Sequence, residues 1–229
     1  MLLLLIETAT SICSVALAQD SEVLAEVHST EPNAHSSKLS PFIDLIFKQC
    51  GLCPSKLDAV CVSSGPGSYT GLRIGVSTAK GFCYALDKPL LAVPTLQSMA
   101  AQFFVAHPSY HGLVCPMIDA RRMECYTAVY SRQGEVKPVS ADILVPGIYD
   151  AYLNQNQVVF FGDGAAKTQP ILGIHANARY APDFLISATG MLPAALQKLR
   201  EHQTEDVAYF EPYYLKDFVA KKSVVHGLR

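Results

Sequence analysis

The feature that most constrains the fold is an order of elements that occurs twice along the chain. Near the N-terminus, three short apolar segments are separated only by short turns, which predicts an antiparallel meander of strands at residues 2–6, 13–18 and 22–27. Segments with alternating helix and strand patterns follow, at residues 36–47, 58–62, 72–86, 90–93 and 95–106.

A similar order begins after the interruption at residues 107–111. Strands are predicted at 113–118, 124–130 and 136–139, then a weaker helix–strand pair ending at 158–161, and a helix near 191–200. The two halves share this plan without repetition of individual residues. We therefore predict two domains, residues 1–106 and 107–229. For the last segment two courses stay open, remaining on the second half or crossing back onto the first.

A meander of three strands followed by helix–strand units, used twice, is the plan of the fold shared by actin, hexokinase and Hsp70-like ATPases. The predicted fold class is therefore α/β, with two actin-like subdomains of the RNase H-like type, each a mixed sheet flanked by helices.

Composition restricts the function. Apolar residues make up 50% of the 229 residues and charged residues 17%, which favours a packed core over disorder. The formal net charge of -2 argues against a strongly basic groove that would hold nucleic acid by itself. We expect any contact with nucleic acid to be indirect or supplied mainly by a partner. The apolar start at residues 1–6 lacks a basic flank and stops at Glu7, so it predicts a buried strand, and no membrane partner is expected.

The cysteines indicate a reducing compartment. Their number, seven, is odd, and most stand in apolar runs, so free buried thiols in the cytoplasm are expected. Cys50 and Cys53 have the spacing of a metal or redox pair. Because no second pair with zinc spacing accompanies them, a structural role is the favoured interpretation.

A glycine-rich loop joins the predicted strand at 58–62 to the helix at 72–86. Its backbone N–H groups and the start of the helix offer a phosphate or nucleotide site, with Gly65, Gly67, Ser68, Gly71 and Arg73 as candidates. It is not a Walker A loop, because no Lys-Ser/Thr follows the last glycine. The alternative is a tight turn with a helix N-cap, which the residues alone favour.

Several motifs together resemble the TsaB family. They are residues 64–75 (SGPGSYTGLRIG), the opening 6–10 (IETAT), 119–126 (DARRMECY) and the late 211–215 (EPYYL), where Lys216 replaces a common arginine. The resemblance implies a non-catalytic partner of the paralogue TsaD and, in bacteria, of the ATPase TsaE. That assembly places a threonylcarbamoyl group on adenosine beside the tRNA anticodon.

The same resemblance predicts that this chain has no catalytic residues and no metal. TsaD-like proteins carry a His-x-x-x-His metal pair where Thr95 and Met99 stand here. His107 and His111 have a similar spacing, but Pro108 argues for a loop. The first turn, residues 7–12, lacks the glycine typical of actin-like ATPases. No cofactor is therefore required, and weak ATP or ADP binding at the interface with TsaD is the expectation that remains.

Two helices are the candidate partner surface. The first carries a broad apolar face and the second carries small residues that permit close helix approach, with candidates Leu39, Phe42, Ile43, Ile46, Arg73, Gly75 and Ala79. We predict a helical bundle with TsaD, and a homodimer through the same surface when TsaD is absent. The alternative is that both faces are used inside the first core. An autonomous enzyme, such as a kinase or a metallopeptidase-like protein, is the competing function, and a generic interaction module is a third.

Overall fold

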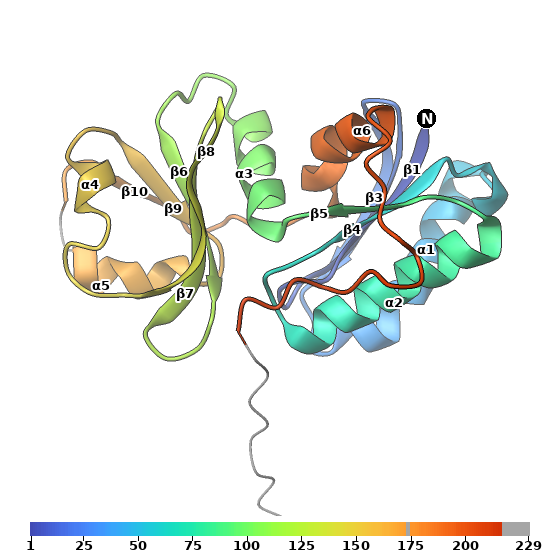
Figure 1. Cartoon of the computed structure of the whole chain (residues 1–229), viewed down its shortest axis with the longest axis horizontal. Helices are drawn as coiled ribbons and strands as arrows, with labels where there is room; N and C mark the ends of the chain where they lie inside the picture. Colours follow the sequence, from blue (N-terminus) through green and yellow to red (C-terminus); the bar gives the residue numbers. More distant parts are fainter. Residues whose placement is uncertain (173–174, 217–229) are drawn as a thin grey trace, which may run out of the picture.

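The computed structural model describes residues 1–172 and 175–216, which form two lobes (Figure 1). The first lobe contains a five-stranded sheet of order β3-β2-β1-β4-β5. Its first three strands pair antiparallel, and β4 and β5 continue from β1 in parallel. The strands are β1 (Leu2–Glu7), β2 (Cys13–Gln19), β3 (Glu22–Ser29), β4 (Ala59–Ser63) and β5 (Leu90–Val93).

The second lobe repeats this arrangement. Its sheet has the order β10-β9-β6-β7-β8, again with three antiparallel strands and two that add in parallel. The strands are β6 (Leu113–Asp119), β7 (Glu124–Ser131), β8 (Gly134–Ile143), β9 (Val158–Phe161) and β10 (Ala178–Ala181). The predicted fold class, two actin-like subdomains with mixed sheets flanked by helices, is confirmed.

Helices cover both faces of the first sheet, which explains why β1 is apolar from Leu2 to Ile6. On one face lie α1 (Ala34–Cys50) and α2 (Tyr69–Leu86), against side chains such as Leu4 and Ile6. On the other face lie η3 (Ala188–Met191) and α6 (Leu192–Arg200), against Leu3 and Leu5. A strand buried on both faces needs a continuous apolar run.

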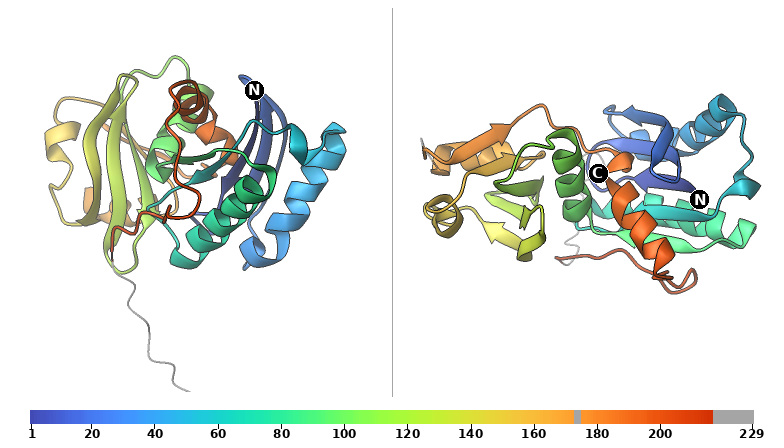
Figure 2. Two further views of the ribbon diagram at one scale, coloured as in Figure 1. Left: turned by 45° about the vertical axis from the view of Figure 1, so that its right-hand side comes forward. Right: turned by 90° about the horizontal axis from the view of Figure 1, so that it is seen from above.

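The lobes exchange helices. The last helix, α6, packs on the first sheet, whereas α3 (Thr95–Ala106) joins the core of the second sheet (Figure 2). A boundary at residue 106 therefore divides the two sheets but not the two cores. Residues 217–229 of the predicted second domain lie outside the described residues.

The remaining helices of the described part are short. They are η1 (Pro54–Lys56), α4 (Asp150–Leu153), η2 (Ala165–Thr168) and α5 (Gln169–Leu172). No helix in residues 1–172 or 175–216 combines the length and apolar character that crossing a bilayer needs.

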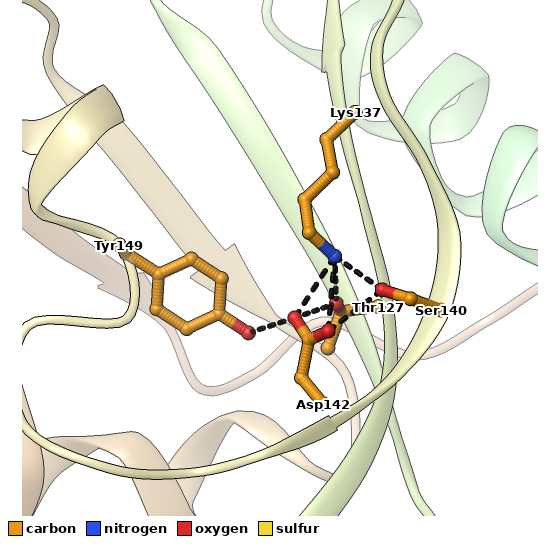
Figure 3. A network of polar contacts seen from close by, with 5 residues as sticks. All are labelled: Thr127, Lys137, Ser140, Asp142 and Tyr149. Atoms are coloured by element: carbon orange, nitrogen blue, oxygen red, sulfur yellow. Dashed lines mark hydrogen bonds and ion pairs between the residues drawn. The ribbon is translucent and has the colours of Figure 1, made fainter.

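A polar network lies on the second sheet (Figure 3). The carboxylate of Asp142 accepts hydrogen bonds from Thr127 (2.6 Å), Ser140 (2.7 Å) and Tyr149 (3.1 Å), and it forms an ion pair with Lys137 at 2.9 Å. The Lys137 and Asp142 side chains are only 19% and 10% exposed. Burial by itself raises the carboxyl pKa, but these hydrogen bonds and the ammonium group hold the pKa of Asp142 below its ordinary value. The folded protein therefore favours the ionised form of Asp142.

We expect Asp142→Asn to lower the free energy of unfolding by about 2–4 kcal/mol, because it leaves the Lys137 ammonium group without its counter-charge. Because the pKa of Asp142 is lower in the folded than in the unfolded chain, its carboxylate stabilises the folded state at pH values above the unfolded-state pKa. This contribution is lost as the pH falls through the folded-state pKa. The variant should therefore lose less stability than the wild type on acidification. Urea unfolding at several pH values measures both effects. The control is Asp44→Asn, which breaks an exposed ion pair with Lys48 and should cost under about 1 kcal/mol; equal losses in the two variants would contradict the assignment.

Candidate functional site

A cleft of about 930 Å³ lies between the two lobes. The first lobe contributes the turn after β1, the start of α1 and the glycine loop before α2. The second lobe contributes the turn between β6 and β7, and the C-terminal segment contributes Tyr213 to Lys216. All four motifs that carry the family resemblance, the glycine loop among them, thus meet at one place.

The glycine loop is packed directly on the backbone of the first turn. A Cβ atom at Gly67 would lie 2.3 Å from the Ala9 carbonyl oxygen, and one at Gly71 would lie 2.1 Å from the Thr8 carbonyl oxygen. The Ser68 N–H donates to the Ala9 carbonyl at 2.6 Å. The glycines therefore permit a backbone-to-backbone contact that a side chain would block.

The polar groups of this loop also bind within the protein. The Ser68 hydroxyl accepts the Gly71 N–H as an N-cap of α2, and the Gly65 N–H donates to the Thr95 hydroxyl. The Arg73 guanidinium donates to the Tyr69 hydroxyl at 2.8 Å and lies over that ring. This geometry is that of a packed turn with an N-cap; a phosphate role for the five candidate residues stays a prediction.

His35 fixes the start of α1 to the same turn. Its Nε2 lies 3.1 Å from the Thr8 carbonyl oxygen and 2.8 Å from the Thr10 carbonyl oxygen. Because both partners are acceptors, Nε2 carries the proton. Sequence reasoning missed this residue, since no periodic pattern distinguishes a histidine at a helix start from a solvated one.

Glu7 is a fully buried carboxyl group at the end of β1. Its Oε1 accepts the Ala9 N–H at 2.6 Å, while Oε2 has no hydrogen-bond partner among the described residues. Burial raises its pKa to about 7, against the opposing effect of the Ala9 hydrogen bond. Within residues 1–172 and 175–216, no group of three or more His, Cys, Asp or Glu side chains could hold a metal ion.

Thr95 and Met99, which the family resemblance sets at the metal-ligand positions of TsaD-like proteins, both have structural contacts. The Thr95 hydroxyl accepts the Gly65 N–H, and Met99 is buried in the core of the second sheet. The nearby His107 donates from Nδ1 to the Phe103 carbonyl at 2.9 Å and stacks on the Phe103 ring. His107 therefore closes the C-terminal end of α3.

On the second lobe, two carboxyl groups of the cleft, those of Asp119 and Asp163, have partners within the lobe. Lys167 forms an ion pair with Asp119, whose N–H donates to Asp163 at 2.8 Å. Burial raises the pKa of Asp163. Arg121 and Arg122 lie in the turn between β6 and β7, with φ angles of 71° and 51°. Both lie in the left-handed region, which few residues other than glycine adopt, and they stand at the rim of the cleft.

The C-terminal segment ties both lobes to the cleft. In Figures 1 and 2 it runs from α6 past α2 towards the second lobe. The Tyr213 N–H donates to the Ser64 carbonyl at 2.7 Å, and the Tyr214 ring lies 4.9 Å from that of Tyr69. Lys216 then forms an ion pair with Glu124 of β7. Residues 213–216 thus connect the two lobes across the cleft, and we call this segment the clasp.

The predicted partner residues divide into buried and exposed ones. Both helices lie on the same face of the first sheet and fill it, so most of the apolar candidates are used within the first core, as one alternative from the sequence allowed. The buried ones are Leu39, Ile43, Ile46, Gly75 and Ala79; Phe42 is half-buried and Arg73 is exposed. Leu45 of the same apolar sequence pattern faces outward and is 40% exposed. Tyr84 of α2, which sequence reasoning did not choose, also faces outward and is 86% exposed.

The two lobes have the same strand order and enclose a cleft. This arrangement is that of the actin-like ATPase fold. The chain aligns with a Pseudomonas aeruginosa protein described as similar to the peptidase YeaZ, with a TM-score of 0.79 and 25% identity, over 94% of this chain and 99% of that one. A Clostridium difficile dehydratase activator with bound ADPNP shares the fold, with a TM-score of 0.52 and 11% identity, over 89% of this chain and 96% of that one.

Sequence comparison gives the family. Residues 22–224 match the family model TsaD, described as tRNA N6-adenosine threonylcarbamoyltransferase. The Escherichia coli K12 protein named tRNA threonylcarbamoyladenosine biosynthesis protein TsaB is 33% identical, with 98% of both chains covered. The Bacillus subtilis protein of the same name is 35% identical over 62% of this chain and 61% of its own. The chain belongs to the TsaB family, which confirms the family predicted from the motifs.

We expect Gly71→Ala to lower the free energy of unfolding by about 2–4 kcal/mol, because the new Cβ would overlap the Thr8 carbonyl and press on the His35 ring. Gly81→Ala in the same helix is the matched control. Its Cβ would meet nothing within 4 Å, so it should be neutral or stabilise by up to about 1 kcal/mol. Urea unfolding compares the two. Equal effects would show that the loop does not depend on a close backbone contact.

We expect Glu7→Gln to remove a pH dependence of stability. The folded-state pKa of about 7 lies above the ordinary 4.5, so the folded wild type holds its proton more tightly than the unfolded chain. Wild-type stability should then fall as the pH rises from about 4.5 to about 7 and level off above, by up to about 3 kcal/mol. Unfolding curves of wild type and variant across this range test the sign; parallel pH profiles would refute it.

Proposed function

We propose that this chain is the non-catalytic partner of a TsaD-type threonylcarbamoyltransferase in the biosynthesis of threonylcarbamoyladenosine beside the tRNA anticodon. The observation that carries the proposal is the use of the aligned metal-ligand positions for packing: Thr95 holds the glycine loop and Met99 is buried. The family membership supplies the pathway, since curated TsaB relatives are named for this biosynthesis.

The outward faces of α1 and α2 are the proposed partner surface. Arg73, Ser77, Gly81 and Tyr84 follow one another at helical spacing along the exposed side of α2, and Leu45 is exposed on α1. Gly81 has open space around it, which favours close approach of a second helix. The exposed aromatic ring of Tyr84 is the kind of side chain that anchors interfaces. The same surface is proposed to form a homodimer when TsaD is absent.

A TsaE-type ATPase is the proposed third member, and tRNA is contacted only through the assembly, in keeping with a net charge of -2.

Weak ATP or ADP binding at the interface with TsaD, without turnover, is also proposed. Arg73 at the exposed start of α2 is the candidate contact. Calorimetric titration with nucleotide, with and without TsaD, tests it, and no heat in either case removes it. The role places the chain in the cytoplasm.

Reconstitution tests the function directly. Modification of tRNA by cognate TsaD and TsaE, with threonylcarbamoyl-adenylate as donor, should require this chain, whereas the chain alone should modify nothing. Modification by the chain alone, or a reaction indifferent to its presence, would overturn the proposal.

For the surface, we expect Tyr84→Asp to weaken binding of TsaD at least about tenfold, because an exposed anchor becomes a desolvated charge. Val105→Asp is the control, since Val105 is also exposed, at 71%, but lies on α3. Circular dichroism confirms folding of both, and calorimetry measures affinity. A Tyr84→Asp variant that binds like the wild type would exclude this face.

A further inference from the structure

The seven cysteines differ sharply in their surroundings. Five are buried, and burial raises the pKa of each of their thiols, for example to about 11 in Cys83 and to about 12 in Cys125. Cys50 is half-buried and Cys53 is exposed. Accessible thiol chemistry is therefore confined to one end of α1.

A helix C-cap lies between the two thiols. Cys50 is the last residue of α1, and Gly51 caps the helix with a left-handed φ of 64°. The Leu52 N–H then donates back to the Phe47 carbonyl at 3.1 Å. Cys53 follows directly, before η1. The left-handed cap thus separates two thiols by the Cys-x-x-Cys spacing that disulfide-exchanging proteins use.

Cys53 also has partners that favour its thiolate. The Ser55 hydroxyl donates to its sulfur at 3.2 Å. This hydrogen bond, with the nearby Lys56 ammonium, lowers the pKa of Cys53. The thiol stands at the edge of an apolar groove of about 440 Å³ whose lining includes Phe47, Leu52 and Phe82. The buried thiols have neither this access nor this hydrogen bond.

We propose that Cys53 is a site of reversible thiol–disulfide exchange and that Cys50 is its resolving thiol, so that a low-molecular-weight disulfide converts the pair into a Cys50–Cys53 disulfide. The Cys53 thiolate attacks one sulfur of the small disulfide, forming a mixed disulfide and releasing one thiolate. The Cys50 thiolate then attacks the Cys53 sulfur, closing the internal bond and releasing the second thiolate. The pair loses two electrons and two protons, and the small disulfide is reduced to two thiols.

Oxidation of Cys50 and Cys53 would affect the end of α1. The groove lies between α1 and α2, so the internal disulfide would stiffen the end of the helix beside the proposed partner surface. This consequence rests on the proposed function, whereas the exchange itself is a property of the isolated chain and is tested on it.

Peptide mapping by mass spectrometry after exposure of the reduced full chain to oxidised glutathione tests the proposal. The wild type should yield the Cys50–Cys53 disulfide. Cys50→Ser should stop at a glutathione mixed disulfide on Cys53, and Cys53→Ser should yield neither product on the same timescale. Ser55→Ala should slow the first step by about threefold or less, because it reduces the thiolate fraction.

Cys83→Ser is the matched control, since this buried thiol of α2 should leave the reaction unchanged. Circular dichroism establishes that each variant is folded. Two results would overturn the proposal. One is a wild type that accumulates only the mixed disulfide, and the other is a Cys53→Ser variant that is oxidised at the wild-type rate.

Discussion

The close contact between the glycine loop and the first turn holds the rest of the site in place. The Ala9 and Thr8 carbonyls receive the loop at distances where only glycine fits, and the Ser68 N–H fixes the contact. From it follow the start of α2, the anchoring of α1 through His35, and the path of the C-terminal segment over Gly65. The polar groups of the loop that could meet a phosphate are hydrogen-bonded to other groups of the protein.

The exchange of helices is the second constraint. Each lobe completes the core of the other, through α3 in one direction and α6 in the other. If the chain were cut between the two sheets, each sheet would lose the helix that covers one of its faces, so the two lobes are expected to unfold together. The buried carboxyl of Glu7 and the network around Asp142 lie in different lobes, and their pKa values shift in opposite directions. The Asp142 contribution to stability is lost on acidification, whereas the Glu7 contribution is lost as the pH rises from about 4.5 to about 7.

Periodicity predicted the elements well because it reports which side chains avoid water. The meander at 2–27 and its counterpart in the second half were predictable in this way, and so was the actin-like class. Periodicity does not say which neighbour covers an apolar face, so Leu39 and Ile46 were assigned to a partner although the first sheet covers them. The contacts of His35 and of Tyr213 depend on segments far apart in the chain, and no local pattern encodes them. Spacing likewise could not separate an exposed Cys53 from a buried structural thiol.

The clasp formed by the C-terminal segment has a mechanical consequence. Two-lobed proteins that act on ligands commonly work as hinges, opening to admit the ligand and shutting around it. In this chain the segment forms a hydrogen bond with Ser64 of the first lobe and an ion pair with Glu124 of the second. These two contacts connect the lobes across the opening of the cleft and oppose hinge opening. With the two lobes held together, the proposed partner surface on α1 and α2 keeps a fixed shape. A protein that binds there would then cost little conformational entropy in this chain.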